Sequence, residues 1–201
     1  MSSFISNQYL IAIIVACVFI MCMPVDIREN LYLNLELTRN GQYWRFISGH
    51  FTHYSWLHCA YNIVALILIF SLFHAVIDHK KWLPPTIFSI CVISLGLILT
   101  SDSLAWYVGY SGVLVCLLSY ACMITYERNP LLSTILLASV TVYVFIQIIS
   151  GGELFASGIL DEISTSSYAH AFGLLSGITY GLLERLRTSI TSTQKRRLDK
   201  N

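Results

Sequence analysis

The sequence predicts an all-α membrane protein, a compact bundle of six transmembrane helices. Three observations lead to this fold class: the composition, six long apolar stretches and the placement of the charged residues. Of the 201 residues, 56% are hydrophobic and 11% are charged, and the mean hydropathy is +0.67. A soluble domain of this size is less apolar, so the chain is classed as a membrane protein. The net charge of +1 gives no indication of a nucleic-acid partner.

Six apolar stretches are long enough to cross a bilayer, and they leave no room for a soluble domain. They cover residues 9–25, 57–77, 84–100, 109–126, 131–149 and 168–186. The first has no preceding Lys or Arg and no small-residue cleavage pattern after it, which favours a retained anchor over a signal peptide. We therefore expect residues 1–201 to form one domain, with a short basic cytoplasmic tail at 187–201.

Lys and Arg are distributed unevenly over the connections. Nine of the twelve lie in the even-numbered connections or near the C-terminal end, and the odd connections carry only Arg28, Arg39 and Arg45. The positive-inside rule then predicts that both termini are cytoplasmic and that the odd connections lie outside. In this topology the second, fourth and sixth spans all begin on the outer side.

Each of these three spans opens with polar residues. The second carries His58 and Asn62, one helical turn apart, the fourth begins near Ser111, and the sixth begins near His170. On each of these helices an acidic residue marks the inner end. Along the helix axis it lies ~21 to 24 Å from the polar residue, at 1.5 Å per residue, so the three polar groups lie at similar depths in the membrane. Because the depths match, the sequence predicts one shared pocket on the outer side.

A ladder of small residues runs along the sixth span and would allow another helix to approach closely. Its members recur at every fourth position: Ala169, Gly173, Gly177 and Gly181. Helix packing without any catalytic role is the alternative interpretation. Since His170 lies at the edge of the ladder and the fourth span offers Gly112, we expect packing that brings His170 within hydrogen-bond reach of Ser111.

A serine next to a histidine is the arrangement that activates a nucleophile. No Asp or Glu lies at the outer ends of the three spans, so the prediction is a dyad of Ser111 and His170. His170 would take the serine proton and deliver it to the leaving amine. The side chains of His58 and Asn62 and the backbone amide of Ser111 would stabilise the oxyanion.

Two simpler interpretations compete with this site. Gly-x-Ser-Gly at a helix start is by itself a common packing pattern. His50, His53 and His58 would suit a metal site, but no carboxylate or cysteine lies nearby at a ligand spacing, so we expect no metal.

Five short motifs, taken in order, resemble those of the rhomboid family of intramembrane serine proteases. They are Trp44-Arg45, His53, His58-x-x-x-Asn62, Gly109-x-Ser111-Gly112 and Ala169-His170-x-x-Gly173. The resemblance covers most of the chain, and it implies that Ser111 is the nucleophile, His170 the base, and His58 and Asn62 oxyanion donors. It also implies that Trp44-Arg45 belong to an outer interfacial loop, that His53 supports the site, and that cleavage occurs in or near a substrate's transmembrane segment without any cofactor.

The compact length and the stretch 41–53 resemble the rhombosortase branch of that family more narrowly. This resemblance implies membrane-anchored substrates that carry a C-terminal Gly-Gly motif, an apolar helix and a basic tail. Cleavage would remove these anchors in the bacterial inner membrane, with the active site open to the periplasm. One departure is Val115, where this branch commonly has histidine and other rhomboids an aromatic residue beside the catalytic histidine.

Two other functions remain open: a rhomboid protease with different membrane substrates, and an inactive rhomboid-like protein that binds membrane helices. Two connections carry further expectations. The alternating leucines of residues 30–37 would suit a strand, but we expect no partner strand and interpret them as an interfacial segment. The connection 151–167 is rich in Gly and Ser and is expected to cover the pocket.

Overall fold

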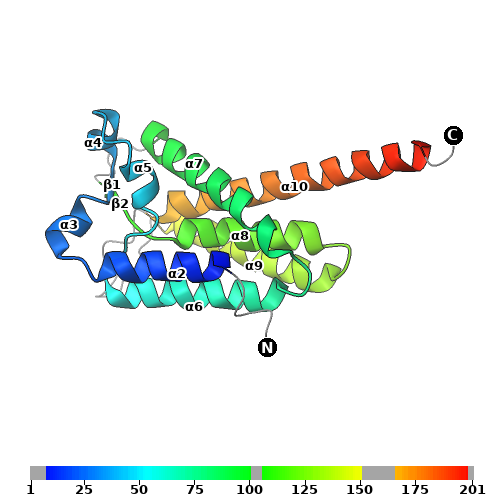
Figure 1. Ribbon diagram of the computed structural model, residues 1–201, viewed down its shortest axis with the longest axis horizontal. Coiled ribbons are helices and arrows are strands. Elements are labelled where there is room, and N and C mark those ends of the chain that lie inside the picture. The colour runs from blue at the N-terminus through cyan, green and yellow to red at the C-terminus, as the bar shows by residue number, and fades with distance from the viewer. Residues whose placement is uncertain (1–7, 101–105, 151–165, 199–201) are drawn as a thin grey trace.

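The computed structural model describes residues 8–100, 106–150 and 166–198. The described chain is mostly helical, and the long helices lie side by side in a bundle (Figure 1). The long helices are α2 (Gln8–Met21), α6 (Trp56–Phe73), α7 (Leu83–Thr100), α8 (Ser111–Thr125), α9 (Pro130–Ile149) and α10 (Ser166–Leu198).

Helix α8 forms the centre of the bundle. It packs against α6, α7, α9 and α10, while α2 packs on the outside against α6. Most of its side chains are buried, including Val113, Cys116 and Leu117 with no exposed surface. The outer helices instead expose large apolar side chains such as Leu68 and Phe145, as expected for surfaces that face lipid.

The helices differ in how well they meet the requirements for crossing a membrane. Among the described residues, three are long and apolar enough by length and composition: Trp56–Phe73, His79–Thr100 and Pro130–Ile149. The apolar helices Gln8–Met21 and Ser111–Thr125 are shorter. The structure is therefore that of a mostly helical membrane protein in which each expected span overlaps one helix.

The ends of three helices differ from the sequence prediction. Helix α6 ends at Phe73, before the predicted end of its span at residue 77. Helix α2 ends at Met21, before Pro24, and not at Val25. Helix α10 continues through most of the expected tail, to Leu198, and it extends well past the other helices in Figure 1. Because residues 182–201 contain neither Gly nor Pro, nothing in the sequence interrupts the helix there.

Short elements gather at the end of the bundle where α8 begins. They are α3 (Val25–Glu29), β1 (Leu33–Asn34), α4 (Leu35–Arg39), α5 (Arg45–Ser48) and β2 (Trp106–Tyr107). The strands pair antiparallel, with Leu33 opposite Tyr107, so the expectation that residues 30–37 have no partner strand was wrong. After β1, the Asn34 side chain accepts a hydrogen bond from the backbone of Leu37 and starts α4.

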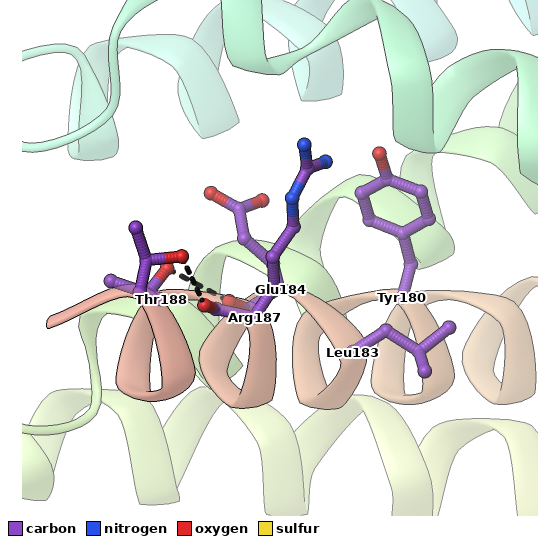
Figure 2. A pocket seen from close by; sticks show the side chains of 6 residues that line it. Tyr180, Leu183, Glu184, Arg187 and Thr188 are labelled. Carbon is purple, nitrogen blue, oxygen red and sulfur yellow. Dashed lines mark hydrogen bonds between the residues drawn. The ribbon is translucent and has the colours of Figure 1, made fainter. Parts of the chain in front are cut away.

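Ion pairs and a hollow mark the opposite end of the bundle, near the 3₁₀ helix η1 (His79–Lys81). Glu184 of α10 accepts hydrogen bonds from Lys81 Nζ at 2.8 Å and from Tyr120 Oη at 2.6 Å. Figure 2 shows Tyr180, Glu184 and Arg187 on one side of α10, lining the hollow. These contacts fix the point at which α10 leaves the bundle.

Candidate functional site

Ser111 and His170 meet at the interface between α8 and α10. Ser111 is the first residue of α8, and its Oγ lies 2.8 Å from Nε2 of His170. The His170 side chain is buried, whereas that of Ser111 is half-buried. The predicted hydrogen-bond contact between the two side chains is confirmed.

The small-residue ladder explains how the two helices come so close. A Cβ atom at Gly173 would collide with the backbone oxygen of Gly112, and one at Gly177 would collide with that of Cys116. A Cβ atom at Gly112 would lie 3.0 Å from the carbonyl oxygen of Ala169, next to His170. The expected packing of the ladder against the fourth span is therefore confirmed.

Gly109 forms the turn that leads into α8, and its backbone has φ of +119°. A Cβ atom here would lie 2.8 Å from Cε1 of His58 and 3.9 Å from Oγ of Ser111. Its amide donates to the carbonyl of Gly49 at 3.0 Å, and its own carbonyl accepts from Tyr107 Oη at 2.8 Å. Only glycine combines this φ with so close an approach of the His58 ring.

His58 and Asn62 both come from α6 but occupy different positions. The half-buried His58 ring lies against Gly109, beside Ser111. The buried Asn62 donates from Nδ2 to the carbonyl of His58 at 2.9 Å, and its Oδ1 has no partner among the described residues. His58 thus lies beside the serine, while one end of the Asn62 amide bonds to the backbone of its own helix.

His53 and His50 lie in the loop before α6. The buried His53 ring meets the His58 ring edge-on, with centroids 5.1 Å apart. The buried His50 donates from Nε2 to Ser94 Oγ at 2.9 Å, and Ser94 in turn donates to the carbonyl of Phe46. Burial lowers the pKa of both loop histidines to about 3, with the nearby His58 adding to the effect at His53.

Trp44 and Arg45 organise the loop between α2 and α6. The Arg45 side chain is only 3% exposed, and its Nη1 donates to the carbonyls of Glu29 and Tyr32 at 3.0 and 2.8 Å. The exposed Trp44 donates from Nε1 to the carbonyl of Asn30 at 3.1 Å. Both residues therefore hold the segment that leads into β1.

Gln147 of α9 is a residue of this site that the sequence prediction missed. Its Oε1 lies 2.6 Å from Nδ1 of His170, and its Nε2 donates to Tyr143 Oη at 2.9 Å. The Tyr143 ring also faces His170, with the centroids 5.8 Å apart. A signal was present: Gln147 is the only amide side chain in a span without charged residues, near the end predicted to lie in the same leaflet as Ser111 and His170.

Val115 follows Ser111 by one turn and contributes only apolar contact. It is buried in a small cluster with Val140 and Val144 of α9, against which Ala171 and Leu174 of α10 pack. An aromatic ring does face His170, but it is supplied by Tyr143 of α9 and not by α8.

An apolar groove of about 380 Å³ leads away from Ser111 and His170. Side chains of α6, α8 and α9 form most of its walls, and they are mainly aliphatic. The lining residues are Ala65, Leu68, Ile69, Leu72, Ser111, Leu114, Val115, Leu118, Leu136, Tyr143 and His170. The serine hydroxyl therefore opens onto an apolar surface beside lipid-facing helices, which suits an apolar peptide segment.

The sequence also predicts that this region holds no metal and that the connection 151–167 covers the pocket. Among the described residues, no group of three or more His, Cys, Asp and Glu side chains could hold a metal ion. The connection expected to cover the pocket falls at 151–165 outside the described residues, apart from its last two positions.

Comparison with known proteins places this chain in a family. No match was found among curated proteins. Residues 40–187 match the Rhomboid domain, a stretch that begins before α5 and ends within α10. It includes every residue of the site described above. The chain therefore belongs to the rhomboid family, whose members are in general intramembrane serine proteases.

Proposed function

We propose that this protein is an intramembrane serine endopeptidase with Ser111 as nucleophile and His170 as general base. The observation that carries the proposal is the 2.8 Å hydrogen bond between Ser111 Oγ and His170 Nε2, next to an apolar groove. His170 removes the hydroxyl proton as Oγ attacks the scissile carbonyl, and it returns this proton to the leaving amine. Water then hydrolyses the acyl-enzyme with the same residue acting as base.

The oxyanion of the tetrahedral intermediate needs donors beside Ser111. His58 is the strongest candidate, because its ring packs on Gly109 within the same turn. The backbone amide of Ser111, at the start of α8, is the second donor. Asn62 completes the set if its amide turns away from the His58 carbonyl when substrate binds.

The membrane arrangement in this proposal follows from the charges. All six long helices cross the bacterial inner membrane, both termini are cytoplasmic, and the site opens to the periplasm. The pairs Lys81–Glu184 and Arg185–Glu127, at 2.8 Å each, then lie at the cytoplasmic end. The basic end of α10 reaches past them towards anionic headgroups.

Substrates are membrane-anchored proteins whose transmembrane segment lies along the groove from Ser111. The stretch 41–53 supports the rhombosortase type, in which the substrate is an exported protein with a C-terminal Gly-Gly anchor. A reporter with such an anchor should be cut at the anchor, and replacing Gly-Gly by Leu-Leu should abolish cleavage. Equal cleavage of both reporters would support a rhomboid protease with other substrates.

The proposed chemistry is tested by labelling the detergent-purified protein with a fluorophosphonate. Wild type should be labelled, and Ser111→Ala and His170→Ala should not. Ser119→Ala, on the same helix, and His74→Ala, at the exposed end of α6, are matched controls that should keep the label. Labelling that survives in Ser111→Ala would contradict the assignment, and a folded wild type that takes no label and cuts no reporter would favour the inactive binder.

A further inference from the structure

Both ring nitrogens of His170 are engaged, and the second one has a partner that the proposed dyad does not include. Nε2 faces Ser111 Oγ, and Nδ1 lies 2.6 Å from Oε1 of Gln147. Gln147 is only 2% exposed and lies in a helix that is otherwise mainly apolar at this end. A buried amide in such a helix is costly unless its polar atoms are used.

The pairing determines which nitrogen of His170 carries the proton. An amide oxygen can only accept, so Nδ1 must donate, and Nε2 is left unprotonated to accept the Ser111 hydroxyl proton. In the structure the other end of the amide, Nε2, donates to Tyr143 Oη at 2.9 Å, which leaves Oε1 to face Nδ1 of His170. If the amide were reversed, its NH₂ group would face Nδ1 and favour the tautomer that cannot act as a base.

We propose that Gln147 is a positioning residue that holds His170 in the Nδ1–H tautomer and directs Nε2 at Ser111, with Tyr143 anchoring the other end of the Gln147 side chain. This inference rests on the proposed function for its catalytic meaning. The site is then a relay of three side chains from three helices, α8, α10 and α9, with an amide in the place of a carboxylate.

A neutral amide has a consequence for the pH dependence of the reaction. Several titratable side chains face His170 or its serine: His58 from α6, Tyr143 from α9 and Tyr107 from β2. The described groove-lining residues include no Asp, Glu, Lys or Arg. Without a carboxylate partner, the imidazolium is stabilised only by dipoles, so replacing Gln147 with Glu should favour protonated His170 at higher pH.

The test measures fluorophosphonate labelling rates between pH 5 and 9. Gln147→Leu, which keeps the size but removes the acceptor, should slow labelling about 10- to 100-fold. Gln147→Glu should restore most of the rate at high pH and move the acid limb upward by about one pH unit or more. Tyr143→Phe should give a smaller loss, and Thr141→Val, at an exposed position on the same helix, should match wild type.

A second readout does not require catalysis. In ¹⁵N NMR of histidine-labelled protein, with His170 assigned by comparison with His170→Ala, wild type should show the Nδ1–H tautomer, and Gln147→Leu should show a mixture. Unchanged rates, pH profile and tautomer in Gln147→Leu would overturn the inference while Ser111-dependent labelling persists. A folded wild type that takes no label and cuts no reporter would instead overturn the proposed function, and the NMR result would still decide the role of Gln147.

Discussion

The site requires glycine at position 109, where there is no room for a Cβ atom. The residue has φ of +119°, and a Cβ atom would lie 2.8 Å from the His58 ring. Gly41 has a similar φ of +100°, but nothing lies within 4 Å of the corresponding Cβ position. Substitutions at these two positions therefore separate the effect of backbone strain from the effect of contact with His58.

Gly109→Ala should slow Ser111-dependent labelling by about tenfold or more, because the new methyl group displaces His58 from the serine. Gly41→Ala should lower stability by a similar strain, about 1 kcal/mol, and keep the labelling rate. Labelling rates and thermal unfolding of both variants in detergent check this prediction. Equal losses of activity in the two variants would mean that strain alone, and not the His58 contact, limits the site.

The sequence identified Ser111 and His170 because each opens an apolar span in the same predicted leaflet. It missed Gln147, whose span runs in the opposite direction in the predicted topology, so that the predicted outer-leaflet position is at the end of the span. The local contacts of Asn62 were not predicted either. Its spacing of four residues from His58 allows a side-chain bond to the backbone of the preceding turn, and this bond competes with the role as oxyanion donor that we expected.

Packing of α8 on α10 sets the geometry of the site at the level of whole helices. Gly173 lies against the backbone of Gly112, immediately after Ser111, so a larger residue must push the two helices apart. Leu175, on the same helix, is 59% exposed and faces away from α8. The two positions give a matched pair for testing the contact.

Gly173→Ala should destabilise the protein by about 1 to 3 kcal/mol, the usual range for overpacking, and should reduce labelling through a longer distance between Ser111 and His170. Leu175→Ala should change neither quantity, because a leucine at a lipid-facing position gains little from burial. Thermal midpoints and labelling rates in the same detergent provide the measurement. A Gly173→Ala protein with wild-type stability and rate would show that α10 can shift without affecting the site.

The glycine ladder was predictable because it repeats at every fourth position, whereas the pair of β1 and β2 was not. Each strand has only two residues, which is too short for an alternating pattern to appear, and the partners are far apart in the chain. The alternating leucines of residues 30–37 overlap β1, but they continue into α4, where the Asn34 cap determines the structure instead. A long-range strand pairing and a local helix cap thus determine the structure of this segment, and neither is visible in the periodicity.

For the whole molecule, hydropathy located every long helix but not how each one ends. Apolar character depends on composition alone, so the six stretches could be found from the sequence. Helix ends depend on local features such as prolines and caps: α2 ends before Pro24, whereas residues 182–201 contain neither Gly nor Pro. For this reason α10 continues past the predicted boundary of the tail, and two of the apolar helices are shorter than a typical span.

Two buried histidines in the loop before α6, His50 and His53, make the stability of the whole protein depend on pH. His50 and His53 have pKa values lowered to about 3 by burial, whereas an unfolded histidine titrates near 6.5. Above pH 6.5 both states are neutral, so neither histidine affects stability. Below it the unfolded state takes up protons that the folded state refuses, and the stability falls progressively until about pH 3.

At pH 5 the loss amounts to about 2 kcal/mol for each histidine, from 1.4 kcal/mol per pH unit. The thermal midpoint of wild type should therefore fall between pH 7.5 and pH 5. In His50→Gln, where the amide can still donate to Ser94, the midpoint should start lower but fall less over the same range. Midpoints that fall equally in both proteins would show that His50 takes up its proton in the folded state, and that the loop before α6 is open to water at low pH.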